Sequence, residues 1–599
     1  MLIRALCDYY DILEKEGKVV PEGYSRVKIS YLISLTSEGD MDGIIDIRNT
    51  EIVPAGKGKT KERKTPCEYL LFQRSEKPGI DANIVEHRPV YIFGLMWDKD
   101  HFTANDRTNK AQKSHKAFVE ANLAFIGDLD SPIVNAYRKF LQKWDPVRET
   151  DNPWLMNLGK EYNAAGYAFC LSGNPGTLLQ DDLAMRVLWM EEYRAQSEKQ
   201  GHIAQCAITG SEAPIARIHG KIKGVRGGLS TGGVLIGFNN DSESSYGNDQ
   251  SYNSNISEVA MQKYTEALNY LLSDSRHRAE IGDMTVVFWA MNQKETYEDL
   301  FAQMAFGRGD QMTAGQTEDM LKQLLKDGAH AGILESQLQS LDIIQTDVDF
   351  YMVGLKPNAS RLSVKFMVRR KYADILWNIV RFQQDLQISR EPRIVWLSQV
   401  EKELVSPKST NEKVNPAMMA KVVEAMIEGL PCPTSLLETV VRRVRIDQGT
   451  EKINRVRAGI IKACINRSSQ KEELTVALDR TNYDQAYLCG RLFATLEKLQ
   501  QEASGNALNR TIRDTYFASA SVKPAAIFPK LIRLAQNHMK KVKRPVFFDK
   551  LVQEIIGELN QCFPERLTLK EQGNFIVGYY QQYQAFFETT NKSSETEEN

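Results

Sequence analysis

The chain has 599 residues, of which 42% are hydrophobic and 26% charged, and a formal net charge of −1, as expected for a globular protein of several domains. No run of about 20 apolar residues exists, which excludes a membrane-spanning helix, and Arg4 and Asp8 interrupt the first apolar run, so we expect no signal peptide. The eight cysteines are scattered without a CxxC pair, which argues against a disulfide framework or a thiolate zinc site and favours a reducing cytoplasm.

The first hundred residues predict mixed α/β structure. Residues 1–15 place apolar side chains at helical spacing, residues 27–35 alternate as a strand does, and residues 43–47 follow a turn as a hairpin partner. Two apolar runs, 69–72 and 90–95, indicate buried strands. We therefore expect a small sheet with at least one helix at the start of the chain.

Residues 55–66 combine glycines with cations and lack large apolar residues, which predicts an exposed, mobile, basic loop. Such a loop suits a flexible electrostatic clamp on DNA or guide RNA, although a solvated linker loop has the same composition. Its candidate contact residues are Lys57, Lys59, Lys61, Arg63 and Lys64.

The middle and end of the chain differ in pattern. A helical stretch is expected at about 108–144, and strands are expected at 234–238 and 284–290. From about residue 365 apolar residues recur every three or four positions in segments separated by Pro and Gly, which is typical of successive helices. The prediction is an α+β fold, with a mixed α/β N-terminal region followed by an all-helical C-terminal bundle. Its predicted domains are 1–365, a helical connecting region at 366–470 and a helical bundle at 471–599.

Enzyme motifs are mostly absent from the sequence, which contains no GxxxxGK[ST] loop and no HExxH. His202 and Cys206 are four residues apart, but no second ligand pair accompanies them. The acidic pairs Asp181-Asp182 and Asp347-x-Asp349 could bind Mg²⁺, yet such pairs are common on surfaces and at helix starts. We expect a protein that is not an enzyme and holds no metal or cofactor.

The segment 205–256 has the most distinctive chemistry. Six glycines between 220 and 233 are interleaved with cations and hydroxyl side chains. Glycines let the backbone approach a ligand closely, successive backbone N–H groups can cradle phosphate, and Lys or Arg add salt-sensitive attraction to DNA. A glycine-rich loop that only forms turns is the alternative. The candidate DNA-binding residues are Arg217, Lys221, Lys223, Arg226, Ser230 and Thr231.

Polar side chains follow this glycine-rich loop and could read base edges or wedge the duplex. They are Asn239, Ser245, Tyr246 and Asn253. For Asn239 and Asn253 the equally good alternative is turn formation through side-chain-to-backbone hydrogen bonds.

Basic residues are concentrated in two C-terminal blocks. Residues 442–467 carry eight cations, and residues 501–550 carry ten cations against three acidic residues. The second block suits a displaced single strand, whereas solvated helix faces are the plainer interpretation. Its candidate residues are Arg510, Arg513, Lys523, Lys530, Arg533, Lys540, Lys541, Lys543 and Arg544.

A set of motifs along the whole chain resembles the large-subunit family of the type I-C CRISPR surveillance complex, Cascade. The first group is Cys-x-Ile-Thr-Gly, Pro-Ile-x-x-x-His, Ile-Lys-Gly-Val, a Gly/Ser-rich turn, Phe-Asn and Ser-Tyr-Gly, at 206–210, 214–219, 222–225, 227–233, 238–239 and 245–247. Further matches are Tyr-Thr-x-Ala-Leu-Asn, Phe-Trp-Ala, Tyr-Leu-Cys-Gly-Arg-Leu-Phe and Glu-Gln-Gly-x-Phe, at 264–269, 288–290, 487–493 and 571–575.

This resemblance implies a non-catalytic role in antiviral defence. A guide RNA reads the target by base pairing, while the protein recognises a short flanking motif, the PAM, in the duplex. The family's large subunit also holds the displaced strand of the R-loop and recruits a helicase-nuclease. Its expected partners are the backbone and guide-end-binding subunits, the guide CRISPR RNA and the target duplex. Similarity to other large subunits favours the minor groove. A nuclease with an unrecognised site and a purely structural scaffold are the alternatives.

The resemblance also implies that the C-terminal bundle could be made separately as a small subunit from the same gene. Residues from about 474 onward suffice for a modest helical core. No methionine lies between Met426 and Met539. A start near the bundle boundary would therefore need a non-AUG codon, for which Leu474, Val476 and Leu478 are the candidate positions.

Overall fold

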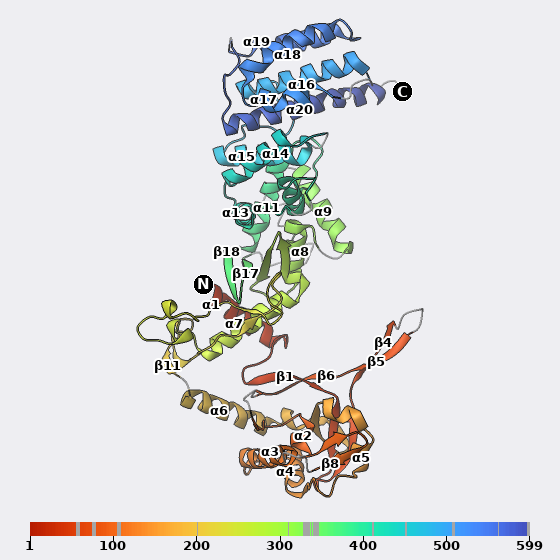
Figure 1. Cartoon of the computed structure of the whole chain (residues 1–599), viewed down its shortest axis with the longest axis vertical. Coiled ribbons are helices and arrows are strands. Elements are labelled where there is room, and N and C mark those ends of the chain that lie inside the picture. The colour runs from red at the N-terminus through yellow and green to blue at the C-terminus, as the bar shows by residue number, and fades with distance from the viewer. Residues whose placement is uncertain are drawn as a thin grey trace. The chain divides into compact units, whose positions relative to one another are not determined.

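The computed structural model in Figure 1 divides into two compact units. Unit 1 comprises Ile3–Gly220 and Gly237–Ala267, and unit 2 comprises Lys221–Ile236 and Leu268–Asn599. The residues that the structure describes are 1–54, 60–74, 79–104, 110–200, 202–308, 311–326, 336, 338, 347–409, 412–449, 452–505, 510–560 and 562–595.

Unit 1 contains a four-stranded sheet of order β10-β9-β2-β3 and the two-stranded pairs β1-β6, β4-β5, β7-β8 and β11-β12. Its strands are β1 (Tyr24–Ile29), β2 (Tyr31–Leu35), β3 (Met41–Asp46), β4 (Asn49–Pro54), β5 (Thr60–Thr65), β6 (Cys67–Phe72), β7 (Met96–Asp98), β8 (His101–Thr103), β9 (Tyr167–Leu171), β10 (Asn174–Leu178), β11 (His202–Gln205) and β12 (Glu212–Ile215). Its helices are α1 (Leu2–Lys15), α2 (Pro89–Ile92), α3 (Lys110–Ile126), α4 (Pro132–Lys143), α5 (Pro153–Met156), α6 (Leu183–Gln200) and α7 (Glu258–Ser273), the last of which continues into unit 2.

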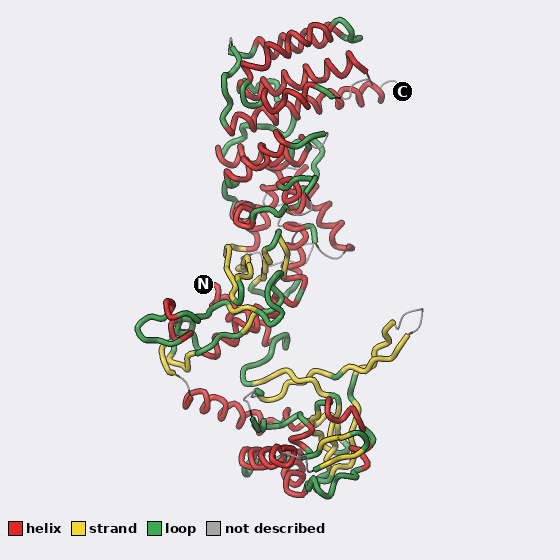
Figure 2. Tube along the Cα trace, in the orientation of Figure 1, coloured by secondary structure: helices red, strands yellow, loops and turns green. Residues whose placement is uncertain are grey.

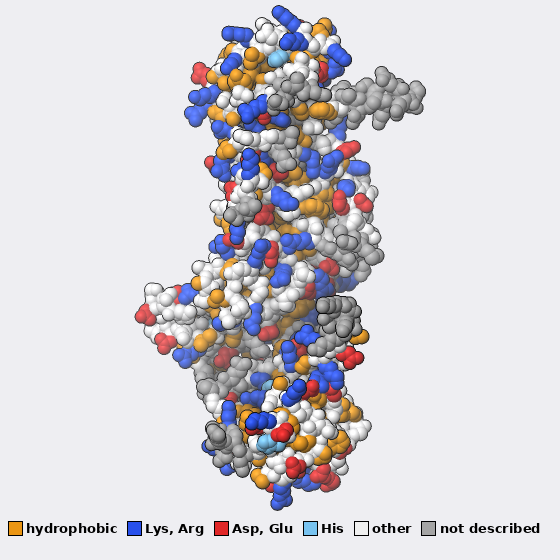
Figure 3. All heavy atoms as spheres, turned by 45° about the vertical axis from the view of Figure 1, so that its right-hand side comes forward, with side chains coloured by type: hydrophobic (Ala, Val, Ile, Leu, Met, Phe, Trp, Pro, Cys, Tyr) orange, Lys and Arg blue, Asp and Glu red, His pale blue; other side chains and the backbone are white. Residues whose placement is uncertain are grey.

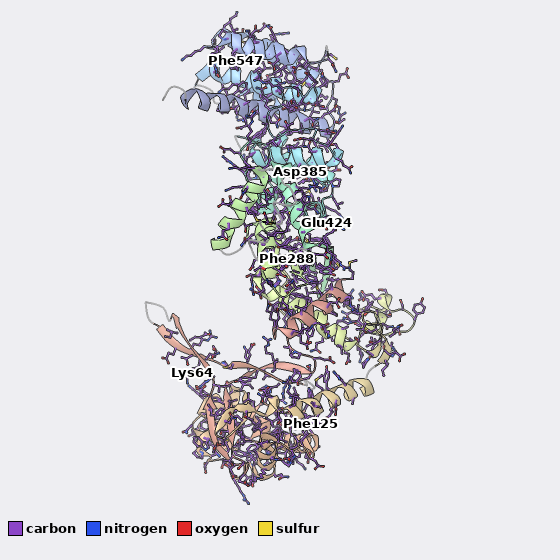
Figure 4. All side chains as sticks on the ribbon, turned by 180° about the vertical axis from the view of Figure 1, so that it is seen from behind. Lys64, Phe125, Phe288, Asp385, Glu424 and Phe547 are labelled. Atoms are coloured by element: carbon purple, nitrogen blue, oxygen red, sulfur yellow. The ribbon has the colours of Figure 1, made fainter. Side chains whose placement is uncertain are left out.

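Aromatic packing holds the core of unit 1. The ring of Phe72 on β6 stacks on Trp189 of α6 with centroids 5.1 Å apart, and Phe125 of α3, labelled in Figure 4, lies against both. The Trp189 indole Nε1 donates to the Gly23 carbonyl at 2.6 Å, so its polar edge is satisfied despite burial. Helix α6 is therefore fixed to the sheet region along one face.

Unit 2 begins with a six-stranded sheet of order β13-β14-β18-β17-β16-β15. The strands are β13 (Lys221–Ile222), β14 (Gly233–Val234), β15 (Arg278–Ile281), β16 (Met284–Ala290), β17 (Asp349–Asn358) and β18 (Arg361–Lys371). One face of this sheet, which includes Phe288 in Figure 4, packs into the same buried core as the helices that follow. These helices are α8 (Thr296–Phe306), α9 (Gln311–Lys326), α11 (Tyr372–Leu386), α12 (Leu397–Leu404), α13 (Pro416–Glu428), α14 (Thr434–Ile446) and α15 (Arg455–Ser469).

A bundle of helices, which Figure 2 draws as separate helices joined by loops, completes unit 2. Its members are α16 (Gln485–Ser504), α17 (Ile512–Ala520), α18 (Pro524–Met539), α19 (Pro545–Gly557) and α20 (Leu569–Glu595). Helices α16 and α20 meet where Gly490 faces the Phe575 carbonyl and Gly578 faces the Tyr487 carbonyl. A Cβ at either glycine would collide with backbone, so these glycines set the close approach of the two helices.

The predicted α+β class is confirmed, because the strands of the described residues lie between Tyr24 and Lys371 and helices fill the C-terminal part. The predicted strand at 284–290 is β16, and the predicted partner at 43–47 is β3, which pairs antiparallel with β2. The boundaries proposed at 365 and 470 stay predictions. No helix of the described chain is both long and apolar enough to cross a membrane.

Four local predictions were wrong. The strand expected at 234–238 reaches only Val234, the last residue of the short strand β14. Residues 90–95 were expected as a strand, but the run is buried within and after the short helix α2, which starts at Pro89 because proline is well suited to a first helical turn. Residues 60–65 were expected within a loop and instead form β5, paired with β4. The single strand expected at 27–35 is divided into β1 and β2, because the Ser30 amide donates to the Gly166 carbonyl outside either ladder.

Candidate nucleic-acid interface

A glycine-rich turn, residues 223–232, lies at the edge of the six-stranded sheet of unit 2. It joins β13 to β14, which pair antiparallel with Lys221 opposite Val234. Strand β14 in turn pairs in parallel with β18 through Val234 and Arg361. The turn is thus carried on a rigid sheet.

Hydrogen bonds fix the backbone of this turn at both ends. The Lys223 amide donates to Asn269 Oδ1 at 2.8 Å, and the Asn269 amide group donates back to the Lys221 carbonyl at 3.1 Å. The Arg226 amide donates to Thr285 Oγ1 at 3.0 Å. Gly232 has a φ of +86°, and a Cβ there would lie 2.7 Å from the Ile222 carbonyl oxygen. Glycine is therefore required for this geometry.

The cations of the turn differ in their availability. Lys221 and Lys223 are exposed, and among the residues that the structure describes neither ammonium group has a hydrogen-bond or ion-pair partner. Arg226 instead pairs with Glu280 of β15, with its Nη1 2.6 Å from the carboxylate. Ser230 and Thr231 are exposed beside the lysines. The turn therefore presents two free positive charges and two hydroxyl groups, with a third cation largely neutralised.

The segment just before the turn belongs to unit 1. Arg217 is exposed, and its Nε donates to Gln250 Oε1 at 2.9 Å. His219 is buried, with its Nδ1 2.5 Å from the Tyr264 hydroxyl, and burial lowers its pKa to about 4. The imidazole is therefore neutral near pH 7 and belongs to the packing of the segment.

The four polar residues predicted after the turn divide into two kinds. Asn253 uses its whole amide group locally, because Oδ1 accepts from the Ser245 amide at 2.8 Å and Nδ2 donates to the carbonyls of Asn248 and Gln250. This pattern is that of a turn-forming asparagine. Tyr246 is fully exposed at a φ of +54°.

Asn239 and Ser245 complete this set. Asn239 is exposed, and its backbone amide donates to Glu243 Oε2 at 2.8 Å. Ser245 is exposed too, with its amide held by the Asn253 side chain. Both side chains, which belong to unit 1, are therefore available to a ligand.

The predicted basic loop is only partly described. Lys57 and Lys59 lie outside the described residues, as does the side chain of Lys61, whose backbone pairs with Val53. Arg63 is exposed on β5. Lys64, labelled in Figure 4, lies 2.8 Å from Asp46, where hydrogen bonds from Arg48 hold the carboxyl pKa well below its usual range.

Most of the predicted C-terminal cations lie on the surface of the helical bundle, where Figure 3 shows Lys and Arg side chains. Arg513 is the exception, because its Nε lies 3.6 Å from the fully buried Glu497 and only 14% of its side chain is exposed. Arg544 lies 3.0 Å from Glu502, and Lys530 lies over the Tyr516 ring. The exposed members are Arg510, Lys523, Lys530, Arg533, Lys540, Lys541, Lys543 and Arg544.

Sequence reasoning missed exposed apolar side chains in the same segment. Leu229, at the tip of the glycine-rich turn, is 55% exposed, and Ile218 in unit 1 is 67% exposed. The sequence signal that could have revealed them is a single large apolar residue placed between glycines, as Leu229 is, or beside a cation, as Ile218 is. Apolar side chains at such positions can contact the faces of bases.

The acidic pairs considered for a metal are engaged elsewhere. Asp349 pairs with Arg369 at 2.6 Å and with Lys371 at 3.1 Å, and Asp182 accepts from the Met185 amide at the start of α6. Within the described ranges no group of three or more His, Cys, Asp or Glu side chains could hold a metal ion.

Comparison with known proteins adds one match. The family model described as "CRISPR-associated protein (Cas_Csd1)" matches residues 6–587, which is nearly the whole chain. No curated protein matches the chain.

Proposed function

The chain belongs to the Cas_Csd1 family of CRISPR-associated proteins, and from this premise we propose that it is the large subunit of a type I-C Cascade complex. In this role it recognises the PAM in duplex DNA, stabilises the R-loop and its displaced strand, and recruits the helicase-nuclease. It performs these steps by binding alone, without catalysis.

The observation that carries the proposal is the glycine-rich turn with its two unpaired lysines. Lys221 and Lys223 have no ion-pair partner among the described residues, so no neighbouring carboxylate competes with a phosphate for them. The backbone between them and Thr231 is held by the sheet, so binding costs little conformational entropy. Such a turn suits the phosphate backbone of a duplex, which is the main source of affinity in DNA binding.

Two further surfaces support contact with nucleic acid. The β4-β5 ribbon carries Arg63 and Lys64, and the C-terminal bundle carries eight exposed cations of the predicted set. The bundle also exposes Val546 and Phe547, so cations and apolar side chains occur together there. Stacking platforms beside positive charge are typical of single-strand binding. We assign the displaced strand to this bundle, which could also be produced separately as a small subunit.

A nuclease with an unrecognised active site is the second candidate. It would need convergent acidic or His side chains, and the described residues contain no cluster suited to a metal. Incubation of the purified chain with DNA or RNA and Mg²⁺ or Mn²⁺ discriminates between the two. Cleavage that is lost on changing a named side chain would support the nuclease.

The deciding experiment is co-expression of the tagged chain with its neighbouring CRISPR genes. The purified complex should contain a guide RNA whose ends are uniform and derive from the CRISPR repeat. It should capture a matching duplex only when the flanking motif is intact. A chain that purifies without RNA or other subunits would refute the proposal.

A further inference from the structure

Helix α6 exposes a second apolar face that its own unit leaves uncovered. Met185 and Trp189 face the core, with relative exposures of 0% and 8%. On another side, Leu183 is 76% exposed and Val187 is 53% exposed. These two residues are four positions apart, so they lie on one face of the helix. Large apolar side chains that are exposed together mark interaction sites more often than single ones do.

A groove accompanies this face. It has a volume of about 570 Å³ and is lined by Leu183, Ala184, Val187 and Leu188 from α6 and by Leu129 and Ser131 from the turn before α4, together with Asp182 and Glu191. The floor is therefore apolar and two of the lining side chains are acidic. Because α6 is held by the Phe72–Trp189 stack and by the Trp189–Gly23 hydrogen bond, the groove is preformed.

The charge around the groove is negative. Asp182 and Glu191 line it, and the exposed Asp128 and Asp130 flank Leu129 in sequence. Two cations are close in sequence to the lining residues: Arg138 of α4 donates to the carbonyls of Gly127 and Leu129, and Arg186 of α6 donates to the Tyr24 hydroxyl. A phosphate backbone would be repelled here, whereas a cationic partner would be attracted.

We infer that this groove, formed by the Leu183–Glu191 face of α6 and the turn at Leu129, docks a basic amphipathic segment of another protein subunit in the same effector complex. The inference rests on the proposed function for the existence of that complex. The chemistry of this contact differs from DNA binding, because apolar side chains of the partner fill the floor of the groove while its Lys or Arg side chains contact the acidic rim.

Photo-crosslinking of the assembled complex tests the inference. A benzoylphenylalanine placed at position 187 should cross-link to a peptide of another subunit in which apolar residues neighbour Lys or Arg. The double variant L183E/V187E should reduce co-purification of that subunit by about tenfold or more, since tenfold corresponds to about 1.4 kcal/mol. Glu favours a helix about as well as Leu, so α6 should form in this variant.

Controls separate the possible failures. E191K should weaken recovery of the same subunit by reversing the rim charge. I446E places a carboxylate on an exposed isoleucine of α14 outside the groove and should leave recovery unchanged. Cross-links only to nucleic acid, to a second copy of this chain, within the chain or to nothing would overturn the inference while the wild-type complex still binds guide RNA. A wild-type chain that joins no complex would overturn both the inference and the proposed function.

Discussion

Removal of the two unpaired lysines of the glycine-rich turn should change the salt dependence of duplex capture. The variant K221A/K223A deletes two exposed charges that have no partner in the described part of the chain. Each cation that neutralises a phosphate contributes about 0.9 to the slope of log K against log salt. The slope should therefore become shallower by up to about 1.8.

The corresponding change in affinity is measurable. Between about 50 and 200 mM salt, each phosphate contact contributes about a 3.5-fold fall in affinity. A variant that lacks two contacts should therefore show a fall in affinity about 12-fold smaller than that of the wild type. The assay is fluorescence anisotropy of a labelled PAM-containing duplex titrated with the assembled complex at several salt concentrations. Exposed surface changes alter stability by no more than about 0.5 kcal/mol, so the melting temperature should be unchanged.

Arg226 supplies an internal comparison. Its ion pair with Glu280 already neutralises much of its charge, so R226A should change the slope less than either lysine substitution does. E280Q should free the guanidinium and steepen the slope by up to about 0.9. The matched control is K408A/K413A, which removes two exposed lysines from the connection before α13. An unchanged slope in K221A/K223A, in a variant that melts normally, would refute the assignment of the turn to phosphate contact.

Four other outcomes are expected. N253A should lower the free energy of unfolding by about 1–3 kcal/mol while PAM preference is retained, because its amide holds the turn, and unaltered melting would contradict this. Y246A should weaken duplex capture without loss of stability, because the ring is fully exposed. Burial lowers the pKa of His219 from 6.5 to about 4, so as pH falls the unfolded chain binds a proton before the folded chain does. The free energy of unfolding should therefore decrease between pH 6.5 and about 4, and H219F should flatten this decrease in pH-dependent melts. E497A should cost about 3–5 kcal/mol in denaturant unfolding because it leaves Arg513 without its buried partner.

Elements with a strong local pattern could be predicted from the sequence. The apolar run at 284–290 is enriched in Val, Phe and Trp, and every residue of β16 is buried, so its identity as a central strand depended little on the rest of the chain. The run at 90–95 has the same apolar character but follows Pro89. A short apolar run does not by itself distinguish a strand from a buried helical turn.

The availability of the candidate site residues could not be predicted. Arg226 and Glu280 are 54 residues apart in the chain, and they pair because the turn after β13 reaches β15, which lies at the other edge of the sheet. Arg513 appeared equivalent to its basic neighbours, yet its guanidinium faces the buried Glu497 carboxylate. Composition gives the number of charged side chains, whereas tertiary contacts determine which of them form ion pairs.

The pairing of β14 with β18 has a consequence for synthesis of the protein on the ribosome. The glycine-rich turn is made early, but Val234 finds its strand partner only at Arg361. A nascent chain that has not yet released β18 from the exit tunnel therefore lacks the ladder that closes this edge of the sheet. Contacts so distant in sequence form late because the intervening chain must first be ordered. The turn would thus acquire its geometry only after most of unit 1 had left the ribosome, which would keep an unfinished chain from engaging DNA.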